Sequence, residues 1–228
     1  MNKTKWAKLG TIIQTILIMT TIIILLTKLF TLTPYPQYNL ADIPALNIFA
    51  IAIIVFVLIK AMRKNSRIES GLSLRQIGKG LKSKSTWVLL FLPALSAAIF
   101  FFVGKYFVPG WAEHVLGRVS LDLTNLPSVA VTLIVMALIE EIMYRAFFQQ
   151  GITRRIGVFP AIVLTSVIFA IGHVSAGIFA IVAFDVLGVF IDSVIFGTIF
   201  AKTKSVWLSF FAHLLGNTAA LILMLFAR

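Results

Sequence analysis

The chain has 228 residues, of which 60% are hydrophobic and 12% charged, and its mean hydropathy is +1.02. Soluble domains are close to half apolar and a quarter charged, so these values exclude an ordinary soluble protein and indicate an all-helical, polytopic membrane bundle. The formal net charge is +12. We attribute it to loops that set membrane topology and expect no nucleic-acid partner, because no basic domain remains outside the apolar spans. The sequence has no cysteine, which excludes disulfides, thiol catalysis and cysteine metal sites.

Apolar runs predict seven spanning helices, and six or eight stay open because two runs are long enough to divide differently. The first two runs cover residues 9–30 and 43–62, separated by an external loop at 31–42. The first run is too long for the apolar part of a signal peptide and precedes no small-residue cleavage site. We therefore expect a multi-pass protein of the cell membrane whose lysine-rich N-terminus lies in the cytoplasm.

The most basic segment of the chain is residues 60–84, in which Glu69 is the only acid. Loops rich in lysine and arginine stay on the cytoplasmic side, so we place this segment there. Within it, residues 70–81 have a composition that suits either an amphipathic helix at the membrane surface or a plain solvated loop. The sequence does not separate these two interpretations.

Five further spans are expected in the rest of the chain, and basic residues mark the cytoplasmic turns between them. They cover residues 87–108, 128–150, 160–175, 177–201 and 205–226. His114 falls in an external connection, residues 109–127, and is expected to be a solvated loop histidine. We divide the single membrane domain into N-terminal spans with the basic loop, residues 1–125, and a catalytic region, residues 126–228.

Three charged residues lie close together inside the fourth predicted span: Glu140, Glu141 and Arg145. Charge at bilayer depth costs several kcal/mol on most scales, so such residues tend to be paired, to face a cavity and to be functional. Glu141 and Arg145 are four residues apart and can form an ion pair on a helix. We expect Arg145 to hold Glu141 ionised, which makes Glu140 available to act on a proton or a water.

Two later spans also carry polar side chains. His173 lies in the fifth, and His213 and Asn217 lie four residues apart, hence on one face, in the seventh. Taken alone, His173 would more often be a structural hydrogen-bonding residue than a catalyst. Polar faces of a bundle point inward, and depths counted at about 1.5 Å per residue agree within about two helical turns. The sequence therefore permits one common site for these residues and Glu140.

A carboxylate, two histidines and an amide suit the activation of water. Glu140 would take a proton from a water that His173 holds, and His213 with Asn217 would donate hydrogen bonds to a developing oxyanion. The chain offers no thiol and no Gly-x-Ser-x-Gly elbow for a covalent nucleophile. Hydrolysis by activated water is therefore the predicted chemistry.

The sixth predicted span contains Asp185 and Asp192, which are seven residues apart and so lie on one face. They could line the same aqueous cavity or contact a basic peptide. They could equally be buried acids that bond to neighbouring hydroxyl groups. Both interpretations stay open at this point.

The polar motifs, in this order on successive spans, resemble those of the CAAX protease and bacteriocin-processing family, whose eukaryotic members are the Ras-converting CAAX endopeptidases. They are Glu-Glu-x-x-x-Arg at 140–145, Phe-x-x-x-His at 169–173 and His-x-x-x-Asn at 213–217. Residues 197–207 also look like the run before the family's last motif, and the resemblance covers about residues 126–220. It implies a helical membrane bundle often counted at eight spans, against the seven expected here.

The resemblance also implies a role for each motif residue. Glu140 would be the catalytic glutamate and His173 the second catalytic residue, with His213 and Asn217 at the oxyanion and Glu141 and Arg145 in support. No cofactor is predicted. A zinc site of Glu140, His173 and His213 stays open, although the usual His-Glu-x-x-His pattern is missing.

The leading hypothesis is an intramembrane endopeptidase that acts on a membrane-associated peptide or protein within the lipid bilayer. The resemblance suggests bacteriocin maturation, self-immunity or the processing of a peptide signal, with CAAX-type cleavage as the eukaryotic counterpart. One alternative is a non-catalytic immunity or scaffold protein that binds a toxin or a sensor partner. Another is a small transporter in which the same acids and histidines relay protons, although the inverted repeats common in transporters are not seen.

Overall fold

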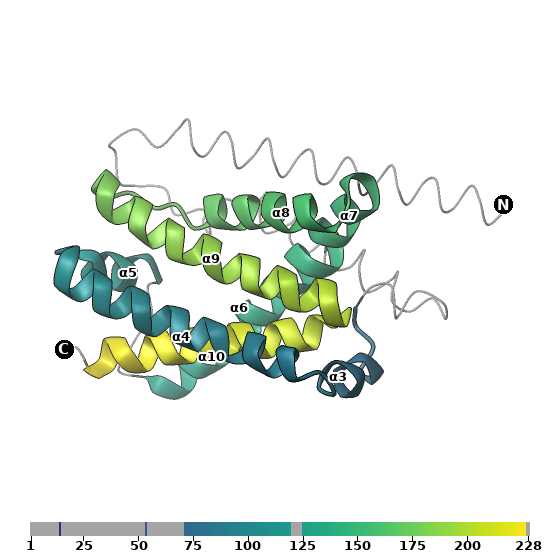
Figure 1. The fold of residues 1–228 in the computed structure, drawn as a ribbon. Helices are drawn as coiled ribbons and strands as arrows, with labels where there is room; N and C mark the ends of the chain where they lie inside the picture. Colours follow the sequence, from purple (N-terminus) through teal and green to yellow (C-terminus); the bar gives the residue numbers. More distant parts are fainter. Residues whose placement is uncertain (1–13, 15–52, 54–70, 120–124, 227–228) are drawn as a thin grey trace, which may run out of the picture.

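The computed structural model describes residues 14, 53, 71–119 and 125–226. The first two predicted spans, the loop between them and the N-terminal part of the basic segment lie outside the described residues, except for Gln14 and Ile53. Regular structure in the described part of the chain is entirely helical (Figure 1). The predicted fold class, an all-helical membrane bundle, is confirmed.

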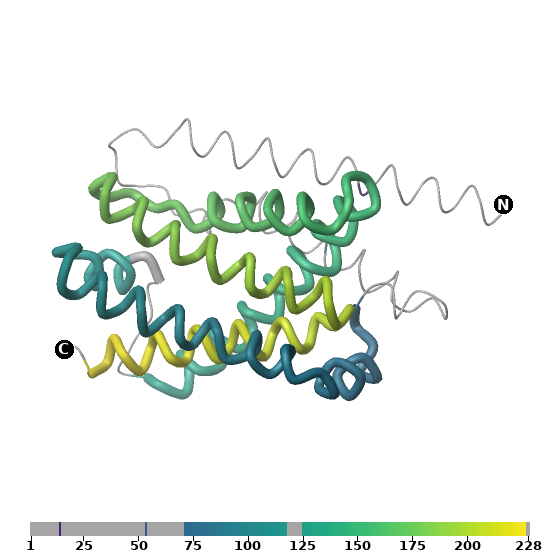
Figure 2. Tube along the Cα trace, in the orientation of Figure 1, coloured from purple at the N-terminus to yellow at the C-terminus, as the bar shows by residue number. Residues whose placement is uncertain are grey.

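Within the residues that the structure describes, four helical stretches are long and apolar enough to cross a bilayer. They are α4 (Lys84–Phe107), the continuous stretch Leu126–Ile156, α9 (Phe179–Thr203) and α10 (Val206–Phe226). The continuous stretch consists of α6 (Leu126–Glu141), the π-helical segment η2 (Ile142–Gln149) and α7 (Gln150–Ile156). A shorter apolar helix, α8 (Val158–Gly172), follows it. The tube in Figure 2 shows α4, α9 and α10 running alongside one another for most of their length.

The outside of this bundle is apolar, as a lipid-facing surface requires. Phe107, Phe159 and Phe179 expose 78%, 75% and 86% of their surface. Exposed aromatic side chains in such number are unfavourable in water and favourable against acyl chains. The bilayer is therefore the solvent of this surface.

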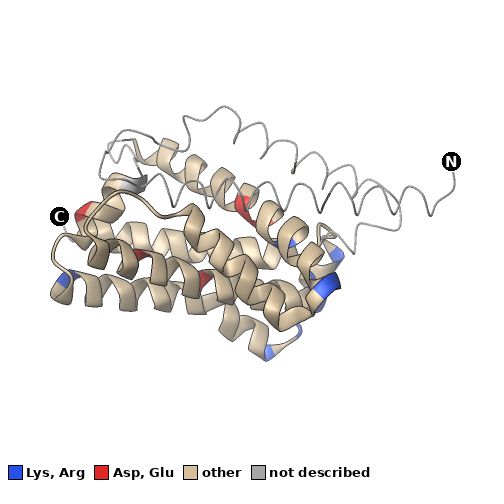
Figure 3. Ribbon diagram, turned by 90° about the horizontal axis from the view of Figure 1, so that it is seen from above, with Lys and Arg blue, Asp and Glu red and all other residues tan. Residues whose placement is uncertain are grey.

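Positive charge is concentrated at one end of the bundle. Most of the lysine and arginine residues in Figure 3 lie at the end away from the C-terminus. This end carries the short helix α3 (Arg75–Gly80), the basic last turn of α7 with Arg154 and Arg155, and Lys202 at the end of α9. The positive-inside rule assigns this end to the cytoplasm, which agrees with the predicted turns, while the orientation of the N-terminus stays a prediction.

Two segments expected to be connections contain short helices. Residues 70–81 include α3, and the connection 109–127 includes α5 (Trp111–Val119). The interpretation of His114 as a solvated loop residue is wrong, since its side chain is only 10% exposed and its Nε2 lies 3.7 Å from Oδ2 of Asp185. Trp111 anchors α5 by packing on Gly104 of α4 and against Phe184 of α9.

Local sequence explains where several helices begin and end. The side chain of Asn125 caps α6 by accepting a hydrogen bond from the Ser128 amide, and proline stands in the first turn. Lys204, in the left-handed conformation with φ of 53°, ends α9, and Ser205 Oγ then accepts from the Leu208 amide at the start of α10. This two-residue turn makes α9 and α10 antiparallel neighbours.

The fourth predicted span is helical but not α-helical throughout. Between Ile142 and Gln149 it adopts the wider i→i+5 winding of a π-helix. The structure keeps the predicted ion pair across the start of this segment, because Arg145 Nε still lies 3.1 Å from Oε2 of Glu141. Nearly every side chain of η2 is buried, and Gln14 from the first predicted span donates to the carbonyl of Phe147.

Candidate active site

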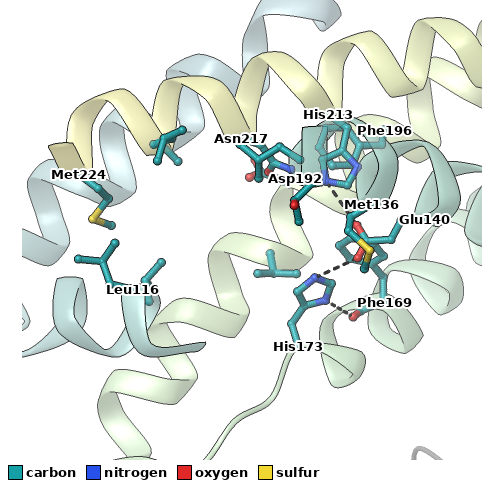
Figure 4. A pocket seen from close by; sticks show the side chains of 16 residues that line it. Leu116, Met136, Glu140, Phe169, His173, Asp192, Phe196, His213, Asn217 and Met224 are labelled. Carbon is teal, nitrogen blue, oxygen red and sulfur yellow. Dashed lines mark hydrogen bonds and ion pairs between the residues drawn. The ribbon is translucent and has the colours of Figure 1, made fainter. Parts of the chain in front are cut away.

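A cavity of about 430 Å³ lies between α5, α6, α8, α9 and α10. Glu140, His173, His213 and Asn217 all line it, together with Asp192 and a majority of apolar side chains (Figure 4). All four predicted catalytic residues therefore meet at one cavity, although they come from three separate helices. Leu116 of α5 and Met224 of α10 mark its apolar end.

Glu140 stands at the centre of the polar side of this cavity. One carboxylate oxygen, Oε1, lies 3.8 Å from Nε2 of His173, and the other, Oε2, lies 3.6 Å from Nε2 of His213. The carboxylate is 21% exposed, so it reaches the cavity and is not sealed in the core. Glu141, by contrast, is wholly buried. This difference agrees with the expectation that Glu141 is held in an ion pair while Glu140 can act on a water.

His173 caps the C-terminus of α8, where the helix gives way to a loop. Its Nδ1 lies 2.9 Å from the carbonyl oxygen of Phe169. A carbonyl can only accept a hydrogen bond, so Nδ1 carries the proton in the neutral ring. Nε2 is then the nitrogen with a lone pair, and it is the one that faces Glu140.

Glu141 orients the ring of His213 so that, as in His173, Nε2 faces Glu140. Its Nδ1 lies 3.1 Å from Oε1 of Glu141, whose other oxygen accepts from Arg145. Because an ionised carboxylate only accepts, Nδ1 of His213 is the donor, and Nε2 faces Glu140 and the cavity. Phe196 stacks on the imidazole with ring centroids 4.5 Å apart and fixes its plane.

The predicted supporting role of Glu141 and Arg145 takes a concrete form in the structure. Arg145 is fully buried and also donates to Ser193 Oγ at 3.0 Å and to Gln149 Oε1 at 3.5 Å. Gln149 in turn donates to the carbonyl of Gly197 at 2.8 Å. These bonds join the π-helical segment to α9 and satisfy a buried cation that would otherwise be costly.

Sequence reasoning missed three members of this network: Gln149, Ser193 and Ser209. The hydroxyl of Ser209 contacts Oε2 of Glu141 and the carbonyl oxygen of Phe196. Gln149 stands four residues after Arg145 and Ser209 four residues before His213, so helical spacing from the motif residues could have found these two. Nothing in the sequence points to Ser193, because its partner lies 48 positions away.

Asn217 lies one turn beyond His213 on α10 and lines the cavity, as its spacing predicts. Figure 4 shows it beside Asp192, farther from Glu140 than His213 is in that view. The amide is therefore placed on the wall along which a bound molecule would extend away from Glu140.

The two aspartates of α9 have different surroundings. Asp192 lines the cavity, in agreement with one of the two open interpretations. Asp185 is not in the lining; it is buried and pairs with His114, whose Nε2 also lies 3.2 Å from Ser175 Oγ. The interpretation that these acids line the cavity is therefore confirmed for Asp192 and wrong for Asp185.

A metal ion would need several converging ligands. Over residues 71–119 and 125–226, no group of three or more histidine and acidic side chains is arranged to hold one. The Glu140 carboxylate does approach both rings, at 3.8 Å from Nε2 of His173 and 3.6 Å from Nε2 of His213. The zinc site stays a prediction, and no step below depends on it.

Fold and site together define a helical membrane protein with a buried glutamate–histidine site that opens on an apolar cavity. Residues 122–219 match the family model described as "Type II CAAX prenyl endopeptidase Rce1-like". This match confirms the resemblance to the CAAX protease and bacteriocin-processing family over the part of the chain that carries all the polar motifs. No curated protein and no solved structure matches the chain.

The family is one of membrane proteases, so the match supports peptidase activity in general terms. The matched region begins close to α6 and ends within α10, two residues beyond Asn217, the last motif residue. The boundary predicted between residues 125 and 126 stays a prediction.

Proposed function

We propose that the protein is an intramembrane endopeptidase that uses Glu140 to activate water. The observation that carries this proposal is the position of the Glu140 carboxylate. It lies between the Nε2 atoms of His173 and His213, at the wall of an apolar cavity. The separations of 3.6 Å and 3.8 Å are compatible with a water that bonds to Glu140 and to one of the rings.

In the proposed reaction, a water held by Glu140 and His173 attacks the carbonyl carbon of the scissile peptide bond. Glu140 removes a proton from this water as the new C–O bond forms. The carbonyl oxygen then carries the negative charge, which Asn217 and His213 stabilise by hydrogen bonds. The C–N bond breaks, and Glu140 returns the proton to the leaving amine, so its carboxylate is regenerated.

Glu141 gives His213 its part in this reaction. With Nδ1 bonded to Glu141, Nε2 can donate a hydrogen bond only when the ring is protonated. The Glu141 carboxylate stabilises the imidazolium form by its charge, while Arg145 keeps that carboxylate ionised. The second glutamate of the motif therefore supports the oxyanion side of the site, and the first acts on water.

The substrate in this proposal is a membrane-associated peptide or protein. An apolar cavity inside a lipid-facing bundle excludes large soluble domains and favours a segment that partitions into the bilayer. Bacteriocin or peptide-signal maturation and self-immunity are the biological roles that fit such a substrate, and CAAX-type cleavage is the counterpart suggested by the name of the matched family.

The test compares new peptide termini in membranes from cells that make the wild type or Glu140→Gln at equal levels. Glu113→Gln is the matched control, because it removes an exposed acid from α5 at the same change in net charge. Termini that are present with the wild type and the control and lost with Glu140→Gln support the proposal. Identical termini in all three would favour the non-catalytic scaffold, and dependence of the phenotype on the proton gradient would favour the transporter.

A further inference from the structure

We propose that Asp192 makes the cavity selective for a substrate that carries a lysine or arginine side chain close to its scissile bond. This inference rests on the proposed peptidase function and adds a feature of the substrate to it. It assigns Asp192 a binding role that is separate from the water-activating role of Glu140.

The carboxyl group of Asp192 has an unfilled hydrogen-bonding position. Its Oδ1 is shielded from solvent and has no hydrogen-bond partner among the residues that the structure describes. Ser96 of α4 lies within reach of a weak side-chain hydrogen bond to the carboxyl group, although its Oγ makes none of normal geometry within the described part of the chain, and His213 of α10 interacts with it through charge. A buried acceptor without a partner is costly, and the cost falls when a bound donor reaches it.

The charge of the cavity points to a cationic donor. The charged residues in its lining are two acids, Glu140 and Asp192, although the chain as a whole is strongly basic. The nearby guanidinium of Arg145 is not in the lining and is bonded to Glu141 and other groups of its own network. The protonated ring of His213, which lies in the same lining, balances one of the two carboxylates. An ammonium or guanidinium group that enters the cavity would therefore meet one net negative charge at low dielectric.

The position of Asp192 sets where that cation would lie. In Figure 4, Asp192 stands between the cluster around Glu140 and the apolar end marked by Leu116 and Met224. A peptide whose scissile carbonyl is at Glu140 would pass Asp192 as it extends along the cavity. An apolar side chain beyond the basic residue would then fill the far end.

Asp185, the other acid of α9, provides a comparison for Asp192. Asp185 is 5% exposed, and although its Oδ2 also makes no hydrogen bond to any described residue, the same oxygen lies 3.7 Å from Nε2 of His114. Asp192 is seven residues later on the same helix and faces the cavity. Asp185 therefore has a charge partner inside the bundle, whereas the carboxyl group of Asp192 lies at the cavity, where a ligand can reach it.

The experiment measures binding separately from hydrolysis. Full-length Glu140→Gln protein in lipid nanodiscs is titrated with fluorescent, N-acetylated and C-amidated apolar peptides that carry one central lysine, glutamine or glutamate. The same titration is repeated after adding Asp192→Asn, Asp192→Glu or the exposed-acid control Glu113→Gln. Melting temperatures of all variants check that the fold is intact.

We expect the lysine peptide to bind at least about tenfold more tightly than the glutamine peptide, which is the size of one charge-assisted hydrogen bond. Asp192→Asn removes this preference, while Asp192→Glu and Glu113→Gln keep it. A lysine preference that survives Asp192→Asn overturns the inference, and so does equal binding of the three peptides to the parent protein.

Hydrolysis by the Glu140-containing protein is measured on the same peptides to separate the two proposals. Selective binding without any hydrolysis supports the role of Asp192 and contradicts the peptidase function. Hydrolysis that is indifferent to the central residue contradicts the role of Asp192 and leaves the peptidase function standing.

Discussion

The Nδ1 atom of His213 lies 3.1 Å from Oε1 of Glu141, and this contact decides which nitrogen of the ring faces the cavity. The same carboxylate holds the buried guanidinium of Arg145 at 3.1 Å. One side chain therefore satisfies a buried cation and orients a histidine. Its removal is expected to affect both the stability of the fold and the chemistry of the site.

Glu141→Ala should lower the free energy of unfolding by about 3–5 kcal/mol, because it leaves Arg145 buried without its counter-charge. The measurement is thermal or denaturant unfolding in detergent. The double variant Glu141→Ala with Arg145→Met removes both charges and should be less destabilised than Glu141→Ala alone. A double variant that is more destabilised than Glu141→Ala would contradict the pairing.

Gly177→Ala should impair the site through a steric clash. A Cβ at this position would lie 2.9 Å from Nδ1 of His114, and His114 also contacts Ser175 in the loop that follows His173. We expect a fall in the turnover number of about tenfold with little change in KM, since misplacing a catalytic group costs rate more than binding. The readout is steady-state hydrolysis of the substrate identified from the membrane peptidome.

The same close approach supplies the control for that prediction. His114→Ala opens the space that the new methyl group needs, so the double variant should be more active than Gly177→Ala alone. His114→Gln should retain activity if the hydrogen bond to Ser175 is what holds the loop. A double variant no better than the single one would show that the glycine matters for another reason.

Gly216→Ala should separate α10 from α4. The added Cβ would lie 2.9 Å from Cβ of Pro93, and overpacking of this kind costs about 1–3 kcal/mol. Gly78→Ala is the matched control, because nothing lies within 4 Å of a Cβ at that position. The melting temperature should fall for Gly216→Ala and stay level or rise for Gly78→Ala.

Removing metal ions tests whether Glu140 activates the water without the help of a bound metal. Protein purified and then dialysed against a strong chelator should keep its rate of hydrolysis, and its zinc content should be well below one ion per chain. Stoichiometric zinc, with loss of activity on chelation and recovery on adding zinc back, would replace the proposed mechanism with one in which a metal binds the water.

Much of the fold could be predicted from the sequence, because a membrane span is recognised by the length of its apolar run. The expected spans 87–108, 177–201 and 205–226 differ by a few residues from α4, α9 and α10. Patterning gave no sign of the π-helical winding of η2, since a wider turn leaves the hydrophobic pattern almost unchanged. Similarly, α5 was missed as a helix because its nine residues are too short to read as a span.

The predicted site residues lie together because charged and amide side chains on apolar spanning helices are unstable against lipid. They therefore face the interior of the bundle, which all the helices share. What spacing could not supply is the identity of partners from distant helices. His114 was misjudged for this reason: its neighbour Glu113 suggested a solvated loop, while its actual partners, Ser175 and Asp185, lie 61 and 71 positions away.

The helix α8 is shorter than the hydrocarbon core of a typical bilayer is thick. Its 15 residues span only about 22 Å, against a hydrocarbon core of about 30 Å, and His173 stands at its inner end. The loop after it continues as non-helical backbone to α9, and a bilayer tolerates such backbone only where protein or water covers it. Because hydrophobic mismatch acts on the ends of a short helix, we expect the rate of hydrolysis to depend on the acyl-chain length of the surrounding lipid.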